Sequence, residues 1–249
     1  CNVKRLRPVA LGPFEYWRGV RSRELWWSEG VTDYFAAELS RRAGLLTESQ
    51  ALDALEGDIQ AYVQNPAVGR LSPERTSETA WDTPAVNQGY SLSYYLQGRL
   101  IGELLELRLR DATDFARGMD DVMRLMYSRY AGERGFTGAQ LYEAAAEVCG
   151  CDLSTFWERY IRAGAPLDPV VAADEARLGG VVPGQRADSR EGVDDLLPGH
   201  GDVGEDVADQ VEEVVDLRRG AHCVLSHVGV DVGGAHQDPL PPGVDPRAP

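Results

Sequence analysis

Aromatic side chains are confined to the first two thirds of this chain. All 20 Phe, Trp and Tyr residues of the 249-residue sequence lie at or before position 160. The rest is built mainly from Gly, Pro, Val, Asp and Glu. A highly charged segment without aromatics buries too little apolar surface to offset its conformational entropy. We therefore expect a folded domain in residues 1–167 and a disordered, low-complexity acidic tail in residues 168–249.

The net charge of -15 follows the same division. Residues 1–167 hold 23 acids and 19 bases, a charge of -4, whereas residues 168–249 hold 17 acids and 6 bases, a charge of -11. The tail also has the composition of a GC-rich coding region read in a shifted frame, which is an alternative hypothesis for it. The sequence has no basic stripe of the kind that would indicate a nucleic-acid partner. It also has no run of about 18 apolar residues, which a membrane span would need.

Apolar spacing predicts that the folded part is mainly α, with no alternating strand pattern. Residues 1–24, interrupted by two prolines, should form an extended lead-in. The helix at 91–110 is apolar over much of its circumference and should be central. A long loop, with Trp81 buried in it, should connect the second and third helices. The expected helices cover residues 24–43, 47–64, 91–110, 118–131, 137–148 and 152–163, and the expected loop covers residues 65–89.

The four cysteines show no disulfide framework for a chain of this length. They are Cys1, Cys149, Cys151 and Cys223. The spacing Cys149-Gly150-Cys151 is too short for a CxxC metal knuckle. We expect it to be a helix end with incidental, unpaired thiols.

Two acids lie in the most aromatic stretch of the chain, residues 25–35 (LWWSEGVTDYF). Helical spacing of i and i+4 places Glu29 and Asp33 on one face. Carboxylates among large apolar side chains are costly unless a cation or a donor meets them. Two interpretations follow: both acids favour the positive end of a helix, or they serve a metal site.

A pair of tyrosines, Tyr94 and Tyr95, opens the predicted central helix. A tyrosine hydroxyl aimed at a polarised carbonyl can stabilise a tetrahedral oxyanion. The alternative is that both rings are ordinary packing residues of an amphipathic helix.

A catalytic zinc needs three protein ligands and an open position for water. The common helical solution is HExxH, with two histidine ligands and a glutamate as general base. All four histidines of this chain lie in residues 168–249, and none lies in residues 1–167. The folded part cannot build that site alone.

Four stretches in order carry a resemblance to a known family. They are residues 2–8 (NVKRLRP), 11–14 (LGPF), 25–34 (LWWSEGVTDY) and 93–98 (SYYLQG). Together they resemble the catalytic domain of the glycyl aminopeptidase family, PDZ-bearing bacterial zinc metallopeptidases related to thermolysin and other gluzincins. The resemblance covers about residues 2–167. It implies the helical C-terminal half of a thermolysin-like catalytic domain, a peptide substrate and a zinc cofactor.

The resemblance also implies roles for three residues. Glu29 matches the third zinc ligand, and Asp33 matches the acid that supports a ligand histidine. Tyr95 matches the tyrosine that steadies the transition state. Gln97 stands where the family usually has lysine, which puts the surface of that helix in question.

The family's HExxH motif precedes the segment that begins at Asn2, and Cys1 stands where the family has Trp. The chain therefore resembles a truncated member, expected to be inactive as given and not to retain zinc. The family's PDZ domain is not recognisable in residues 168–249. The alternative is a non-catalytic helical interaction module that kept the peptidase fold. Cytoplasm and periplasm both stay open, as does the oligomeric state.

Overall fold

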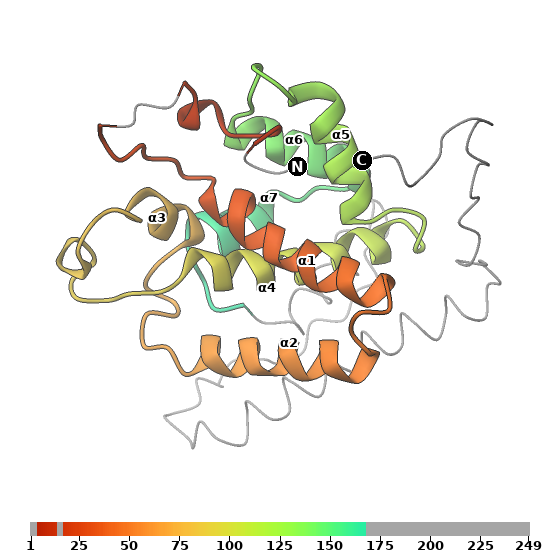
Figure 1. Cartoon of the computed structure of the whole chain (residues 1–249), viewed down its shortest axis with the longest axis horizontal. Coiled ribbons are helices and arrows are strands. Elements are labelled where there is room, and N and C mark those ends of the chain that lie inside the picture. The colour runs from red at the N-terminus through yellow and green to blue at the C-terminus, as the bar shows by residue number, and fades with distance from the viewer. Residues whose placement is uncertain (1–3, 14–16, 168–249) are drawn as a thin grey trace, which may run out of the picture. The chain divides into compact units, whose positions relative to one another are not determined.

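The computed structural model describes residues 4–13 and 17–167 of the chain (Figure 1). The acidic tail, predicted to be disordered or frame-shifted, lies outside these described residues. Its boundary with the folded domain therefore stays a prediction. Within the described residues, no helix has the length and apolar character needed to cross a bilayer.

The described part of the chain is mainly α, as predicted, and Pro8 and Phe136 form an isolated β-bridge. All six predicted helices are present, with ends shifted by a few residues. The α-helices are α1 (Val31–Arg42), α2 (Glu48–Val63), α3 (Pro73–Glu78), α4 (Tyr94–Ala112), α5 (Met119–Tyr130), α6 (Gly138–Cys149) and α7 (Ser154–Phe156). The π-helical segments are η2 (Trp26–Gly30) and η4 (Trp157–Arg162), and the 3-10 turns are η1 (Val9–Leu11) and η3 (Pro84–Asn87).

Local sequence signals set several helix ends. Thr47 caps α2 in a capping box with Gln50, as its pattern predicts. Thr137 and Gln140 form the same arrangement at the start of α6. Gly150 ends α6 in the left-handed conformation that favours glycine.

Helix α4 is central, as its apolar circumference predicts. It packs against η2, α1, α2, α3, α5 and α6. Figure 1 shows α1 crossing α4, with α2 beneath this pair. Ile101, Leu105 and Leu109 of α4 have no exposed surface. The domain core is therefore built around this helix.

Two glycines allow η2 and α4 to approach until their backbones touch. A Cβ built on Gly30 would lie 2.6 Å from Gly98 Cα and 2.7 Å from Tyr94 O. A Cβ on Gly98 would overlap the carbonyl oxygen of Trp26. One turn later, a Cβ on Gly102 would lie 2.9 Å from the Cβ of Tyr34. No side chain fits at the first two positions, so their glycines fix the distance between the two helices.

The N-terminal lead-in is extended, as predicted, and pairs with the loop before α6. The Val9 N–H donates to Phe136 O over 2.8 Å, and the Phe136 N–H donates to Arg7 O over 3.0 Å. Leu6 is fully buried beneath this pairing. The lead-in is thus part of the folded domain.

The prediction of one long loop at residues 65–89 is wrong in part, because α3 and η3 lie inside it. Helix α3 is short and polar (PERTSE), so it has no apolar period to detect. Its signal is the Ser72 cap followed by proline at the first helical position. Trp81 is not buried: its side chain is 69% exposed, and its Nε1–H donates to Val20 O over 3.0 Å.

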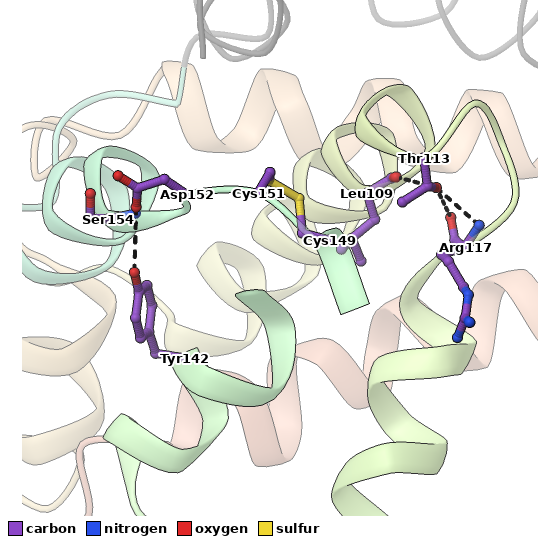
Figure 2. The surroundings of a disulfide bond; sticks show 8 residues. All are labelled: Leu109, Thr113, Arg117, Tyr142, Cys149, Cys151, Asp152 and Ser154. Carbon is purple, nitrogen blue, oxygen red and sulfur yellow. Dashed lines mark hydrogen bonds between the residues drawn. A yellow bond between two sulfur atoms is a disulfide. The ribbon is translucent and has the colours of Figure 1, made fainter. Parts of the chain in front are cut away.

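The expectation of unpaired thiols is also wrong, because Cys149 and Cys151 form a disulfide (Figure 2). The helix end was predicted correctly. The left-handed turn at Gly150 brings the two Cα atoms to 5.0 Å, within the range that a disulfide spans. Sequence spacing does not reveal this turn.

Candidate functional site

Glu29 lies in the π-helical turn that precedes α1. The Val31 N–H donates to Trp26 O, five residues back. Single π turns inside helices are frequent at functional sites. Because η2 runs directly into α1, the first N–H groups of α1 already have partners. A free helix start therefore does not account for Asp33, which lies in the first turn of α1.

Buried groups fix the position of this turn. Trp26 and Trp27 are at most 1% exposed. The Trp26 N–H donates to the Ser77 hydroxyl of α3 over 2.9 Å. The Trp26 ring also packs edge-on against Trp157, with ring centroids 5.9 Å apart. The carboxylate of Glu29 thus projects from a rigid base.

The carboxylate of Glu29 meets both tyrosines of α4. A hydrogen-bonding interaction with Glu29, followed by burial, raises the pKa of Tyr95 to about 12. Burial and the same carboxylate raise the pKa of Tyr94 further. Oε2 of Glu29 is nevertheless buried without a hydrogen-bond partner. One carboxylate oxygen thus remains available to a cation or a donor.

Tyr95 lies at the edge of the site. Its side chain is 40% exposed and stacks on Tyr94, with ring centroids 4.8 Å apart. A cavity of about 200 Å³ beside the start of α4 is lined by Tyr94, Asp82 and Asn87, among others. The structure therefore brings Glu29 and Tyr95 together, and the neighbouring cavity is lined by Tyr94 rather than by these two residues.

Two further acids, Asp33 of α1 and Asp58 of α2, extend the site beyond the tyrosines. Burial raises the pKa of Asp33, the charge of Glu29 raises it further, and Arg99 of α4 lowers it. Arg99 Nε lies 2.7 Å from Asp58 Oδ2 of α2. This contact is ionic and is not aligned as a hydrogen bond. Burial therefore outweighs Arg99 and raises the pKa of Asp58.

The site thus carries three carboxylates, of Glu29, Asp33 and Asp58, with Arg99 as the guanidinium among them. One positive charge does not balance three, so the site keeps a net negative charge. Sequence reasoning found Glu29, Asp33 and Tyr95 but missed Arg99 and Asp58. Arg99 follows Tyr95 by four residues and so shares its helix face, which is the signal that could have found it.

Gln97 does not lie on the surface of α4, which corrects the expectation for that position. The side chain is 2% exposed. Its Nε2 donates to Leu71 O over 2.9 Å, and its Oε1 accepts from the Thr76 hydroxyl over 2.7 Å. Gln97 therefore ties α4 to α3 and to the segment before it.

The described residues do not complete a metal site. In residues 4–13 and 17–167, no group of three His, Cys, Asp or Glu side chains is placed to hold an ion. Glu29 could supply one ligand.

Comparisons with known proteins found two similarities. Residues 1–101 match the sequence profile of the M61 glycyl aminopeptidase family. A solved structure of an aminopeptidase N family protein from Idiomarina loihiensis is similar, with a TM-score of 0.62 and 27% sequence identity. The similarity covers 70% of this chain and 30% of that protein. No curated protein matches. The predicted resemblance to glycyl aminopeptidases is thereby confirmed.

Proposed function

We propose that residues 4–167 form the glutamate-and-tyrosine part of a zinc aminopeptidase site that acts on peptides. The observation that carries the proposal is the buried, unpartnered Oε2 of Glu29, beside Asp33, which interacts with the same Arg99 as Asp58 does. The family match over residues 1–101, which include both Glu29 and Tyr95, supports it.

The residues present fit zinc in part. A buried carboxylate oxygen without a partner suits a zinc ligand, and Glu29 supplies it. Residues 1–167 contain no histidine, so the remaining ligands must come from outside them. When bound, zinc would polarise a scissile carbonyl and lower the pKa of its water. We expect residues 4–167 alone not to hold zinc tightly.

The other side chains have roles that follow from their positions. Asp33 would accept the N–H of a ligand imidazole and so fix the orientation of the ring. The hydroxyl of Tyr95 is protonated at neutral pH, as that of an ordinary tyrosine is. A protonated hydroxyl at the exposed edge of the site can donate to an oxyanion of a bound peptide.

Zinc content and peptide cleavage test this proposal. The chain as given should contain much less than one zinc per molecule and should not release the first residue of a peptide. Adding a helix with an HExxH motif before Cys1 should restore one zinc and cleavage. In that extended chain, Glu29→Gln should lose the zinc. Tyr95→Phe should keep it and lower kcat by about 100-fold or more.

Two results would contradict the proposal. One is a tightly held zinc in the chain as given. The other is full zinc retention by the extended chain after Glu29→Gln. Glu56→Gln on α2 is the matched control for the loss of a carboxylate and should change neither quantity.

The second candidate is a non-catalytic helical interaction module. The missing three-ligand cluster within the described residues favours it. It predicts that the extended chain regains neither zinc nor cleavage although it folds normally by circular dichroism.

A further inference from the structure

The disulfide between Cys149 and Cys151 adds little to the stability of its surroundings. It closes a loop of three residues, and short loops constrain the unfolded chain least. The backbone around it is already held: Gly150 N–H donates to Ala146 O over 2.9 Å, and Ser154 N–H donates to Asp152 Oδ1 over 2.8 Å. A role in holding the fold therefore does not account for this bond.

The two sulfurs have different surroundings. Cys149 is 3% exposed and ends α6, whereas Cys151 is half-buried. A cavity of about 740 Å³ between α5 and α6 is lined by Cys149 and not by Cys151. Figure 2 shows Thr113 and Arg117, which also line the cavity, on the far side of Cys149 from Cys151. A molecule in the cavity would thus approach the disulfide from the Cys149 side.

These surroundings decide which sulfur leaves when the bond is opened. A leaving thiolate with a lower pKa leaves faster. A thiolate on Cys149 would be buried and would face the negative end of α6. A thiolate on Cys151 would be partly solvated. Cys151 is therefore the better leaving group. We expect a thiol in the cavity to attack Cys149 and to release Cys151.

The cavity wall also has charges that a carboxylate could use. Two arginines of the wall pair with a single carboxylate. Oδ1 of Asp121 lies 4.0 Å from Nη1 of Arg117 and 3.1 Å from Nη1 of Arg124. The other acid of the wall, Glu147, is bound by both guanidinium nitrogens of Arg129, at 2.7 and 2.8 Å. Asp120 also lies 3.9 Å from Arg124 but is itself bound by a further arginine, at 2.6 Å.

We propose that Cys149 and Cys151 form a thiol–disulfide exchange site for a small carboxylate-bearing thiol that binds in this cavity. The cavity volume lies in the range of small-molecule sites. The thiolate of the ligand attacks Cys149 Sγ, a new S–S bond joins them, and Cys151 leaves as a thiolate. A second thiol then attacks the mixed disulfide, which releases the ligand as its disulfide and leaves Cys149 reduced. Two ligand thiols are oxidised and one protein disulfide is reduced. This site is independent of the proposed peptidase function.

Glutathione is the probe that tests the proposal. The full chain with Cys1→Ser and Cys223→Ser keeps Cys149 and Cys151 as its only cysteines. The folded protein is incubated with glutathione, quenched with acid, alkylated and assigned by tandem mass spectrometry. We expect a glutathionyl group on Cys149 and the alkyl group on Cys151, without denaturant. A disulfide that opens only in denaturant, or an adduct on Cys151, would overturn the proposal.

Two variants test the cavity itself, with 2-mercaptoethanol as the thiol that lacks a carboxylate. Ala116→Trp, at an exposed wall position, should slow opening by glutathione about tenfold and should slow opening by the smaller 2-mercaptoethanol less. Arg124→Gln should slow glutathione alone. If both variants react with glutathione as the parent does, the cavity does not bind the thiol and the proposal fails.

Discussion

The contact between η2 and α4 differs from the neighbouring helix α2 in what determines its structure. At the crossing, the backbones of Gly30 and Gly98 touch, and Glu29 keeps a buried oxygen without a partner. Helix α2 starts with a capping box, buries Leu55 on one face, and has open space around Gly57. Local sequence rules explain α2, whereas only the contact between two distant segments explains the crossing.

The difference shows where this domain tolerates no added side chain. The backbone contact places the carboxylate of Glu29 beside Tyr94 and Tyr95, which side chains larger than glycine would prevent. Groups that lack partners or tolerate no substitution are typical of functional sites rather than of stable cores. Two predictions test this contrast, and a third tests the charge of the neighbouring site.

The largest expected effect comes from adding one methyl group to each region. Gly98→Ala should lower the free energy of unfolding by about 3 kcal/mol or more, because the new Cβ overlaps the backbone of Trp26. Gly57→Ala on α2 should raise it by about 0.5 to 1 kcal/mol, because alanine favours the helix and nothing lies within 4 Å. Urea unfolding measures both values. Equal effects of the two substitutions would remove the contrast.

A medium effect is expected from the buried amide beside the crossing. Gln97→Leu should lower the free energy of unfolding by about 2 kcal/mol, because Leu71 O and the Thr76 hydroxyl lose their buried partner. The control is Gln60→Leu on α2, where the amide of the exposed glutamine bonds to Glu56. It should change stability by less than about 0.5 kcal/mol. A small effect at Gln97 would show that water replaces its bonds.

The smallest expected effect is on the pH dependence of stability, which should have opposite signs at two Asp–Arg pairs. Burial raises the pKa of Asp58 above 3.8 despite Arg99, so the folded state binds more protons and stability falls as pH rises through that window. Hydrogen bonding to Arg21 lowers the pKa of the half-buried Asp82, so its contribution to stability is lost as pH falls.

Urea midpoints from about pH 3 to pH 7 measure these slopes. Relative to the parent, Asp58→Asn should gain stability as pH rises, and Asp82→Asn should lose it. Slopes of the same sign would mean that Arg99 neutralises Asp58 fully and that the site carries less negative charge than the geometry indicates.

Periodicity and capping signals predicted every α-helix of the described residues except α3, and the central position of α4, because these depend on neighbours within four residues. The motif positions Glu29 and Tyr95 were predicted through resemblance, and the structure brings them together. Arg99 and Asp58 were missed because their pairing joins segments 41 residues apart in the sequence. The disulfide was missed because the backbone turn at Gly150, rather than residue spacing, brings the two cysteines together.

The contact between Gly30 and Gly98 has a consequence for the evolution of this domain. When a side chain overlaps another side chain, a smaller neighbour can restore the fit. Here the overlapped atoms are backbone, which no substitution can shrink. A lineage that loses either glycine has no compensating second-site change at this contact, so the two positions should be retained as long as the helices cross.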